Sequence, residues 1–135
     1  MTRYVLLLRG VNVGTNNSLP IAKLRAMLQK VGASNVQTYI QSGNAVFDTR
    51  LDAEPLKRGI ERSLERAMGR PIDTTLRDES QMKSIVAANP FPEKTADPAR
   101  LCITFLSATP TATELAQLRE RDWSPELVHV AGQEI

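Results

Sequence analysis

The fold is decided near the N-terminus by the apolar run Tyr4-Val5-Leu6-Leu7-Leu8 and by the loop that follows it, Arg9-Gly10-Val11-Asn12-Val13-Gly14-Thr15-Asn16-Asn17-Ser18. An unbroken apolar run is typical of a central strand that is covered on at least one face, because exposed strands usually alternate. A strand that ends in a loop rich in glycine and asparagine can present backbone N–H groups to a ligand. This stretch therefore predicts a first strand and a first candidate site.

The patterns that follow predict an α+β order. Pro20 fits the first turn of a helix whose apolar residues recur at helical spacing up to Gly32, a suitable C-terminal cap. From Asn35 the pattern has a period of two, and Ser42-Gly43-Asn44 predicts a hairpin turn before a second extended run, residues 45–47.

A second helix is expected from about Asp52 to Gly69, because apolar residues recur there at every fourth position. A short extended segment over residues 72–77 and a helix capped by Asp78 or Ser80 complete the pattern. The predicted order is βαββαβ with an added helix, in a unit of residues 1–88.

The proline-containing stretch over residues 89–98 predicts a connector to a second unit, residues 99–135. There we expect a strand at residues 101–106, a helix at residues 111–121, a strand at residues 126–130, and a last strand that only begins at Glu134. This is a partial second βαβ repeat. An unfinished half-sheet leaves an unpaired edge, so we expect a shortened chain that self-associates through that edge.

Composition narrows the class of protein. The chain has 135 residues, of which 41% are hydrophobic and 24% are charged. Its net charge of +2 is too small to indicate a nucleic-acid-binding protein. Cys102 and His129 are the only residues of their kinds, which excludes a disulfide framework and a cysteine- or histidine-rich metal site. Cys102 is expected to be a buried thiol in its strand. The first apolar run is too short to span a membrane and lacks a cleavage site, so we expect a cytoplasmic protein without metal or cofactor.

Several motifs together resemble a known family. They are Leu8-Arg9-Gly10-Val11-Asn12-Val13-Gly14, Leu19-Pro20, Leu24-Arg25, Thr38-Tyr39-Ile40-Gln41-Ser42-Gly43-Asn44-Ala45-Val46-Phe47 and Asn89-Pro90-Phe91. They look like the family catalogued as domain of unknown function 1697, over essentially the whole chain. The resemblance implies ferredoxin-like βαββαβ halves and no established activity, cofactor or substrate. Two features depart from the family: Thr15-Asn16 replace a typical glycine and basic residue, and a C-terminal segment with a Gly-Arg-Ser-Lys-like motif is absent.

In a βαββαβ plait, the loop after the first strand, the turn between the second and third strands and the link from the second helix emerge at the same end. We therefore expect a ligand site there. The predicted binding residues are Arg9, Gly10, Asn12, Gly14, Gln41, Ser42 and Asn44, with Thr15 and Asn16 nearby and Arg70 at the rim. Their guanidinium, amide and hydroxyl groups suit a phosphate or carboxylate. The alternative is that these residue types serve only turn geometry. The loop is neither a Walker loop nor a dinucleotide fingerprint.

Three functional hypotheses remain open from the sequence. The leading one is a binding protein for a small anionic or polar ligand at this end. The second is an enzyme acting on a phosphorylated or carboxylated substrate there, with Ser42 or His129 as the reacting group. The third is an interaction or assembly module that uses the open strand edge.

Nucleic-acid binding is disfavoured, although Arg58, Arg62 and Arg66 recur at every fourth position of the second helix. Glu61 and Glu65 each follow an arginine by three residues, and Glu54 precedes one by four, which predicts local ion pairs and a solvated helix face. The nearest aromatic residues do not form the stacking motif that plait-fold RNA binders use.

Overall fold

One antiparallel sheet is formed by four strands of the computed structural model: β1 (Thr2–Leu8), β2 (Ser34–Gln37), β3 (Asn44–Thr49) and β4 (Thr74–Asp78). Their order in the sheet is β2-β3-β1-β4. The first strand is therefore central, as its apolar run predicts, and it pairs antiparallel with β3 and with β4.

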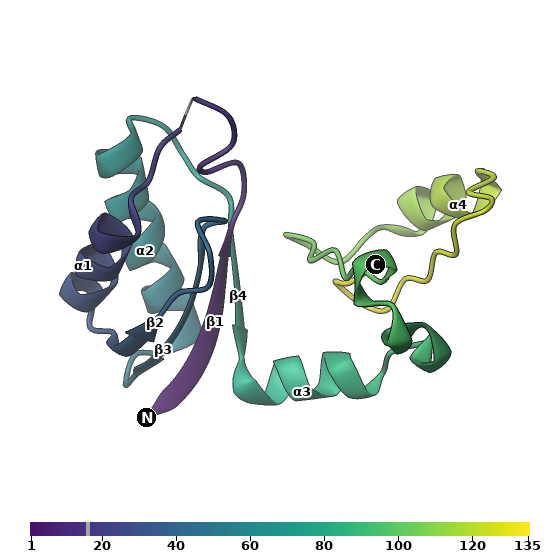
Figure 1. Cartoon of the computed structure of the whole chain (residues 1–135), viewed down its shortest axis with the longest axis horizontal. Helices are drawn as coiled ribbons and strands as arrows, with labels where there is room; N and C mark the ends of the chain where they lie inside the picture. Colours follow the sequence, from purple (N-terminus) through teal and green to yellow (C-terminus); the bar gives the residue numbers. More distant parts are fainter. Residues whose placement is uncertain (16) are drawn as a thin grey trace. The chain divides into compact units, whose positions relative to one another are not determined.

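The structure describes residues 1–15 and 17–135, except the side chain of Thr95. Four α-helices lie in this part of the chain (Figure 1): α1 (Ile21–Val31), α2 (Ala53–Met68), α3 (Glu79–Ala87) and α4 (Ala112–Glu120). The protein thus has the expected mixed α+β class. No helix among these residues combines the length and apolar composition that a membrane crossing requires.

The chain divides into two units, Met1–Ser84 and Ile85–Ile135. The division falls inside α3, ahead of the connector predicted at residues 89–98. In the first unit the elements follow the predicted order, and α1 and α2 lie on the same side of the sheet (Figure 1).

Local signals fix the helix ends of the first unit. Gly32 and Gly69 have φ values of 105° and 71° and cap α1 and α2 in the left-handed conformation, as predicted. The start of α3 is held by Asp78, whose carboxylate accepts a hydrogen bond from the backbone N–H of Gln81 at 2.8 Å. Glycine is needed at these C-terminal caps because other residues pay a steric cost there.

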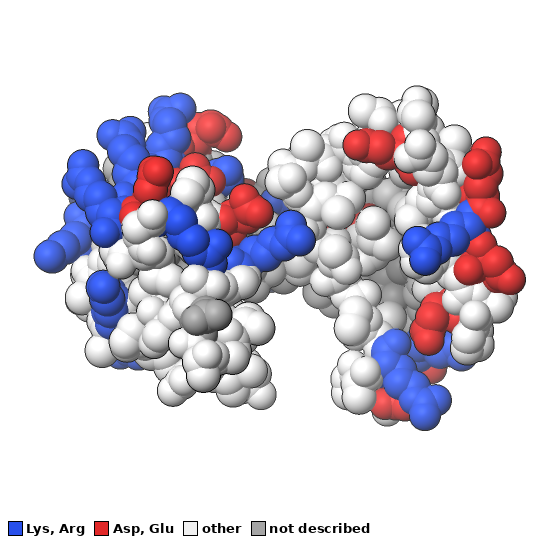
Figure 2. Space-filling model, turned by 90° about the horizontal axis from the view of Figure 1, so that it is seen from above, with Lys and Arg blue, Asp and Glu red and all other residues white. Residues whose placement is uncertain are grey.

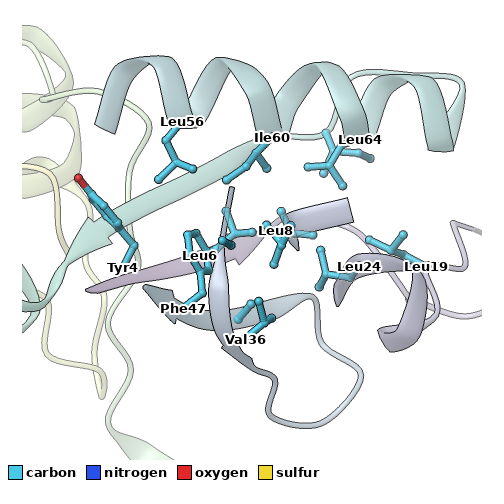
Figure 3. Packing of buried hydrophobic residues seen from close by; sticks show 14 of the residues in the cluster. Tyr4, Leu6, Leu8, Leu19, Leu24, Val36, Phe47, Leu56, Ile60 and Leu64 are labelled. Carbon is cyan, nitrogen blue, oxygen red and sulfur yellow. The ribbon is translucent and has the colours of Figure 1, made fainter. Parts of the chain in front are cut away.

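The core lies between the sheet and the two helices (Figure 3). Alternate residues of β1 (Tyr4, Leu6 and Leu8) point to the same side as Phe47 of β3. They meet the buried faces of α1 and α2, which are formed by Leu24 and Leu28 and by Leu56, Ile60 and Leu64. Two residues of the β1–α1 segment, Val11 and Leu19, are also buried, so this loop is anchored in the core.

The second unit corrects the predicted partial βαβ repeat. Its helix forms as α4, but residues 101–106 and 126–130 do not form strands. Instead, the backbone around Thr104 pairs with the last residues: the Thr104 N–H donates to the Ile135 carbonyl at 2.8 Å, and the Leu106 N–H donates to the Gln133 carbonyl at 2.7 Å. Two paired segments without further strands or a buried face are marginal, which explains the failed prediction. Cys102, expected to be buried, is exposed.

Candidate functional site

Three connections of the first unit meet where β1 ends. The Leu8 N–H donates to the carbonyl of Gly43 at 2.7 Å, and the Arg9 N–H donates to the carbonyl of Asp73 at 3.0 Å. These bonds tie the β2–β3 turn (residues 38–43) to the last residue of β1 and the α2–β4 link (residues 69–73) to the start of the β1–α1 loop (residues 9–20). We call these three connections together the loop end.

Gly43 brings the turn against the loop. It is buried and has a φ of +74°, and a Cβ atom built there would overlap the Val11 side chain and lie 3.1 Å from the Leu8 Cβ. Only glycine permits this approach together with a positive φ. The turn and the loop are therefore in direct contact, as the strand order predicts.

Asn12 closes the β1–α1 loop. Its side-chain oxygen accepts a hydrogen bond from the Leu19 N–H at 2.7 Å, and its amide nitrogen donates to the Leu19 carbonyl at 2.9 Å. Its φ of 53° lies in the left-handed region, which asparagine tolerates better than most residues. These contacts match the turn-geometry alternative: the Asn12 side chain holds the loop in shape.

Asn44 plays the same part in the β2–β3 turn. Its side chain accepts from the Tyr39 N–H at 2.9 Å and donates to the Tyr39 carbonyl at 2.6 Å and to the Ser42 hydroxyl at 2.5 Å. Ile40, which follows Tyr39 in this turn, has a φ of 48°, a region that β-branched residues rarely adopt. Tyr39 and Ile40 are 75% and 63% exposed, so this strained turn presents apolar side chains to solvent.

Two arginines lie next to Gly10 of the loop: Arg9 precedes it in the chain, and Arg70 contacts its carbonyl. The Arg9 side chain is 86% exposed, and its Nη1 lies 3.8 Å from an oxygen of Asp73. From the α2–β4 link, Arg70 donates through Nε to the Asn17 side-chain oxygen at 3.1 Å and through Nη2 to the Gly10 carbonyl at 3.4 Å. Gly10 and Gly14 both have positive φ values, and a Cβ at either would meet nothing within 4 Å. The surface beside the glycines is open.

The remaining predicted residues are exposed to solvent, except for one that the structure does not describe. Gln41, Ser42 and Thr15 are exposed in their turns, and Asn16 lies outside the described residues. Two further residues belong to this end: Asp73, which no sequence pattern indicates, and Asn17, which lies in the first predicted loop but is not among the predicted binding residues. Their signal was weak, because only the tertiary contacts with Arg9 and Arg70 connect them to it.

Other site types are not found in the described structure. No group of three or more His, Cys, Asp or Glu side chains that could hold a metal ion occurs among the described residues. A shallow hollow of about 420 Å³ lies at the opposite end of the sheet, where Met1, Val31, Arg50 and Leu51 contribute to its walls. It contains none of the predicted site residues.

Among the described residues, neither Glu61 nor Glu65 of α2 makes its predicted pair with an arginine. Glu61 accepts from Lys57 at 2.7 Å and from the Thr74 hydroxyl at 2.9 Å, so the local pair expected between Glu61 and Arg58 is wrong. Burial opposes ionisation of Glu61, but the hydrogen bonds from Lys57 and Thr74 outweigh it and lower its pKa. The Glu61 carboxylate therefore forms its ion pair with Lys57 and not with Arg58.

Comparison with known proteins gives a family and a structural relative. The conserved bacterial protein SP0830 from Streptococcus pneumoniae is similar in structure, with a TM-score of 0.75 and 28% sequence identity, over 94% of this chain and 68% of that chain. No protein with a curated description matches. The family described as "Protein of unknown function (DUF1697)" matches residues 1–135, the whole chain. This agrees with the resemblance carried by the sequence motifs, and the chain belongs to that family.

Proposed function

We propose that the loop end binds a small ligand through a phosphate or carboxylate group. One observation carries the proposal: Arg9 and Arg70, which come from different connections, meet at Gly10 in a loop whose two positive-φ glycines have open space beside them. Guanidinium groups bind such anions through charge-assisted hydrogen bonds, and the open glycines let a ligand approach the backbone.

The asparagine clamps support this proposal in a different role from the predicted one. Asn12 and Asn44 are positioning residues, because their side chains hold the loop and the turn in fixed shapes. A fixed loop loses less conformational freedom when it binds. The side chains left to contact the ligand are Arg9, Arg70 and the exposed Gln41. The strand order β2-β3-β1-β4, with both helices on one side, supports the ferredoxin-like plait on which this placement rests.

Asp73 lies beside Arg9 and would compete with an anionic ligand for its guanidinium group. Its carboxylate lies 3.8 Å from the Arg9 guanidinium, and both side chains are highly exposed. Exposed ion pairs of this kind contribute little, up to about 1 kcal/mol. A phosphate or carboxylate that also reaches the loop backbone is therefore expected to displace it.

The experiment is a thermal-unfolding screen of the full chain with inorganic phosphate, nucleotides and small di- and tricarboxylic acids. A ligand of the site should raise the Tm. At a ligand concentration one hundred times its Kd, the free energy of unfolding should increase by about 2.7 kcal/mol. Arg9→Ala should remove that shift, Asp73→Asn should enlarge it, and Arg50→Ala, at the other end of the sheet, should leave it unchanged. If no compound gives a shift that depends on Arg9, the proposal is wrong.

A further inference from the structure

A second basic surface lies on the outer sides of α1 and α2. We call it the helical face. On α2, each of Arg58, Arg62 and Arg66 follows a buried core residue by two positions. Two positions correspond to about 200° of rotation around a helix, so the arginines are on the side opposite the core. Successive arginines of this set are about 6 Å apart along the helix axis.

These three arginines are not neutralised by their neighbours. All three are exposed, and none makes an ion pair or a side-chain hydrogen bond within the part of the chain that the structure describes. Of the acids spaced to pair with these arginines, Glu61 is held by Lys57 and Thr74 instead, and neither Glu54 nor Glu65 makes an ion pair among the described residues. The reason for treating this stripe as an internally paired surface is therefore removed.

The first unit concentrates its positive charge on this face. Residues 1–84 contain 13 Lys and Arg against 8 Asp and Glu, a net charge of +5, whereas residues 85–135 contain 4 against 7, a net charge of −3. The helices α1 and α2 alone contain seven basic and three acidic residues, a net charge of +4. Figure 2 shows Lys and Arg side chains gathered over the part of the first unit where these helices lie. The overall charge of +2 conceals this concentration.

The helical face also lacks the apolar anchors that other partners require. The large hydrophobic side chains exposed in the described structure lie outside α1 and α2. Protein interfaces are usually centred on buried aromatic or aliphatic residues, and helices that bind membranes insert an apolar side. Sequence-independent contact with a phosphate backbone needs neither, because Lys and Arg and the counterions they release supply the affinity.

We propose that the helical face binds the phosphate backbone of a nucleic acid without sequence preference, through the Arg58, Arg62 and Arg66 stripe of α2 and the basic residues of α1. Those α1 residues are Lys23, Arg25 and Lys30, all exposed, and α1 contains no acidic residue. Arginine suits this role because its planar guanidinium group matches phosphate geometry. The inference goes beyond the proposed function, since it rests on residues other than Arg9 and Arg70 and needs no small ligand.

The test is fluorescence anisotropy of the full chain with a short mixed-sequence DNA duplex and with the RNA duplex of the same sequence, across salt concentrations from about 50 to 200 mM. We expect weak binding that falls steeply with salt and does not depend on the sequence. Arg58→Ala/Arg62→Ala/Arg66→Ala should make the log–log salt dependence on DNA shallower by up to about 2.7, which is about 0.9 for each lost phosphate contact. Replacing the same three residues with lysine should restore most of the slope.

A matched control removes three exposed basic residues outside the helical face, Arg50→Ala/Arg100→Ala/Arg119→Ala. It should keep the wild-type slope, and circular dichroism of both triple variants should show the wild-type fold. The proposal is overturned if wild type does not bind either duplex at the lowest salt, or if the control loses as much slope as the α2 variant. Equal binding of a polyglutamate peptide of the same charge would also overturn it, in favour of an acidic protein partner. Because Arg9 is untouched in both variants, its ligand-dependent thermal shift remains a separate readout.

Discussion

Asp48 is the charged residue on which three strands of the first unit converge. It is buried in β3, where it faces Arg3 of β1 in register and accepts hydrogen bonds from Arg3 at 2.8 and 3.1 Å. Asn35 of β2 donates to the same carboxylate at 2.9 Å. The hydrogen bonds from Arg3 and Asn35 lower the pKa of Asp48 to about 2. The carboxylate thus joins β2, β3 and β1 at the end of the sheet away from the loop end.

This lowered pKa predicts how stability depends on pH. A carboxyl group with a pKa of about 2 when folded and 3.8 in its ordinary state contributes stability above pH 3.8, and that stability is lost as the pH falls through this interval. In urea unfolding, the difference in stability between wild type and Asp48→Asn should therefore shrink as the pH falls from 3.8 to about 2. The exposed change Glu126→Gln should follow the wild-type curve. A difference that stays constant over this interval would contradict the account.

Local patterns predict β1, α1 and α2 because the signals for these elements lie within each of them. Glycine caps and apolar spacing need no tertiary information, and Gly32 and Gly69 cap as predicted. The roles of the site residues could not be read in this way. Asn12 is equally suited to bind a ligand or to close a loop, and only its two bonds to Leu19 show that it closes one. For the same reason, spacing allowed Glu61 to pair with Arg58 or with Lys57, and the structure has Lys57.

The contact between the β2–β3 turn and the β1–α1 loop depends on Gly43. An alanine there meets two penalties: a left-handed backbone costs about 1–2 kcal/mol, and overpacking against Val11 and Leu8 costs about 1–3 kcal/mol more. Gly43→Ala should therefore lower the free energy of unfolding by about 2–5 kcal/mol, measured by urea denaturation. Gly14→Ala is the matched control, because it has a similar φ but open space around its Cβ, and it should cost only the backbone penalty. Equal losses in the two variants would show that the turn does not pack against the loop.

Burial is distributed unevenly over the chain, because the buried side chains that the structure describes all belong to the first unit. The buried side chains run from Tyr4 to Thr74, all in the first unit, and none of the described side chains of residues 85–135 is buried. Within the second unit, order comes from the backbone pairing of Thr104 and Leu106 with the last residues. Local contacts add to it: the capping box of Thr111 and Glu114 at the start of α4, and the Trp123 indole N–H, which donates to the Leu118 carbonyl at 2.8 Å. Strands predicted from apolar runs fail here because a strand needs a neighbouring layer to bury its side chains, and the second unit does not supply one.

This distribution predicts different behaviour for the two halves when they are separated. A fragment of residues 1–88 retains the whole sheet, α1, α2 and every residue of the core, so it should unfold cooperatively with a free energy close to that of the full chain. A fragment of residues 89–135 buries none of its described side chains and should give the narrow amide dispersion of an unfolded chain in NMR. Thr111→Ala in the full chain is the companion measurement: it should remove hydrogen-exchange protection from α4 and leave that of β1 and α2 unchanged, because the core does not depend on that cap. Dispersed amide signals from residues 89–135 alone would show that the second unit folds without a core, and an unfolded fragment 1–88 would show that the first unit needs it.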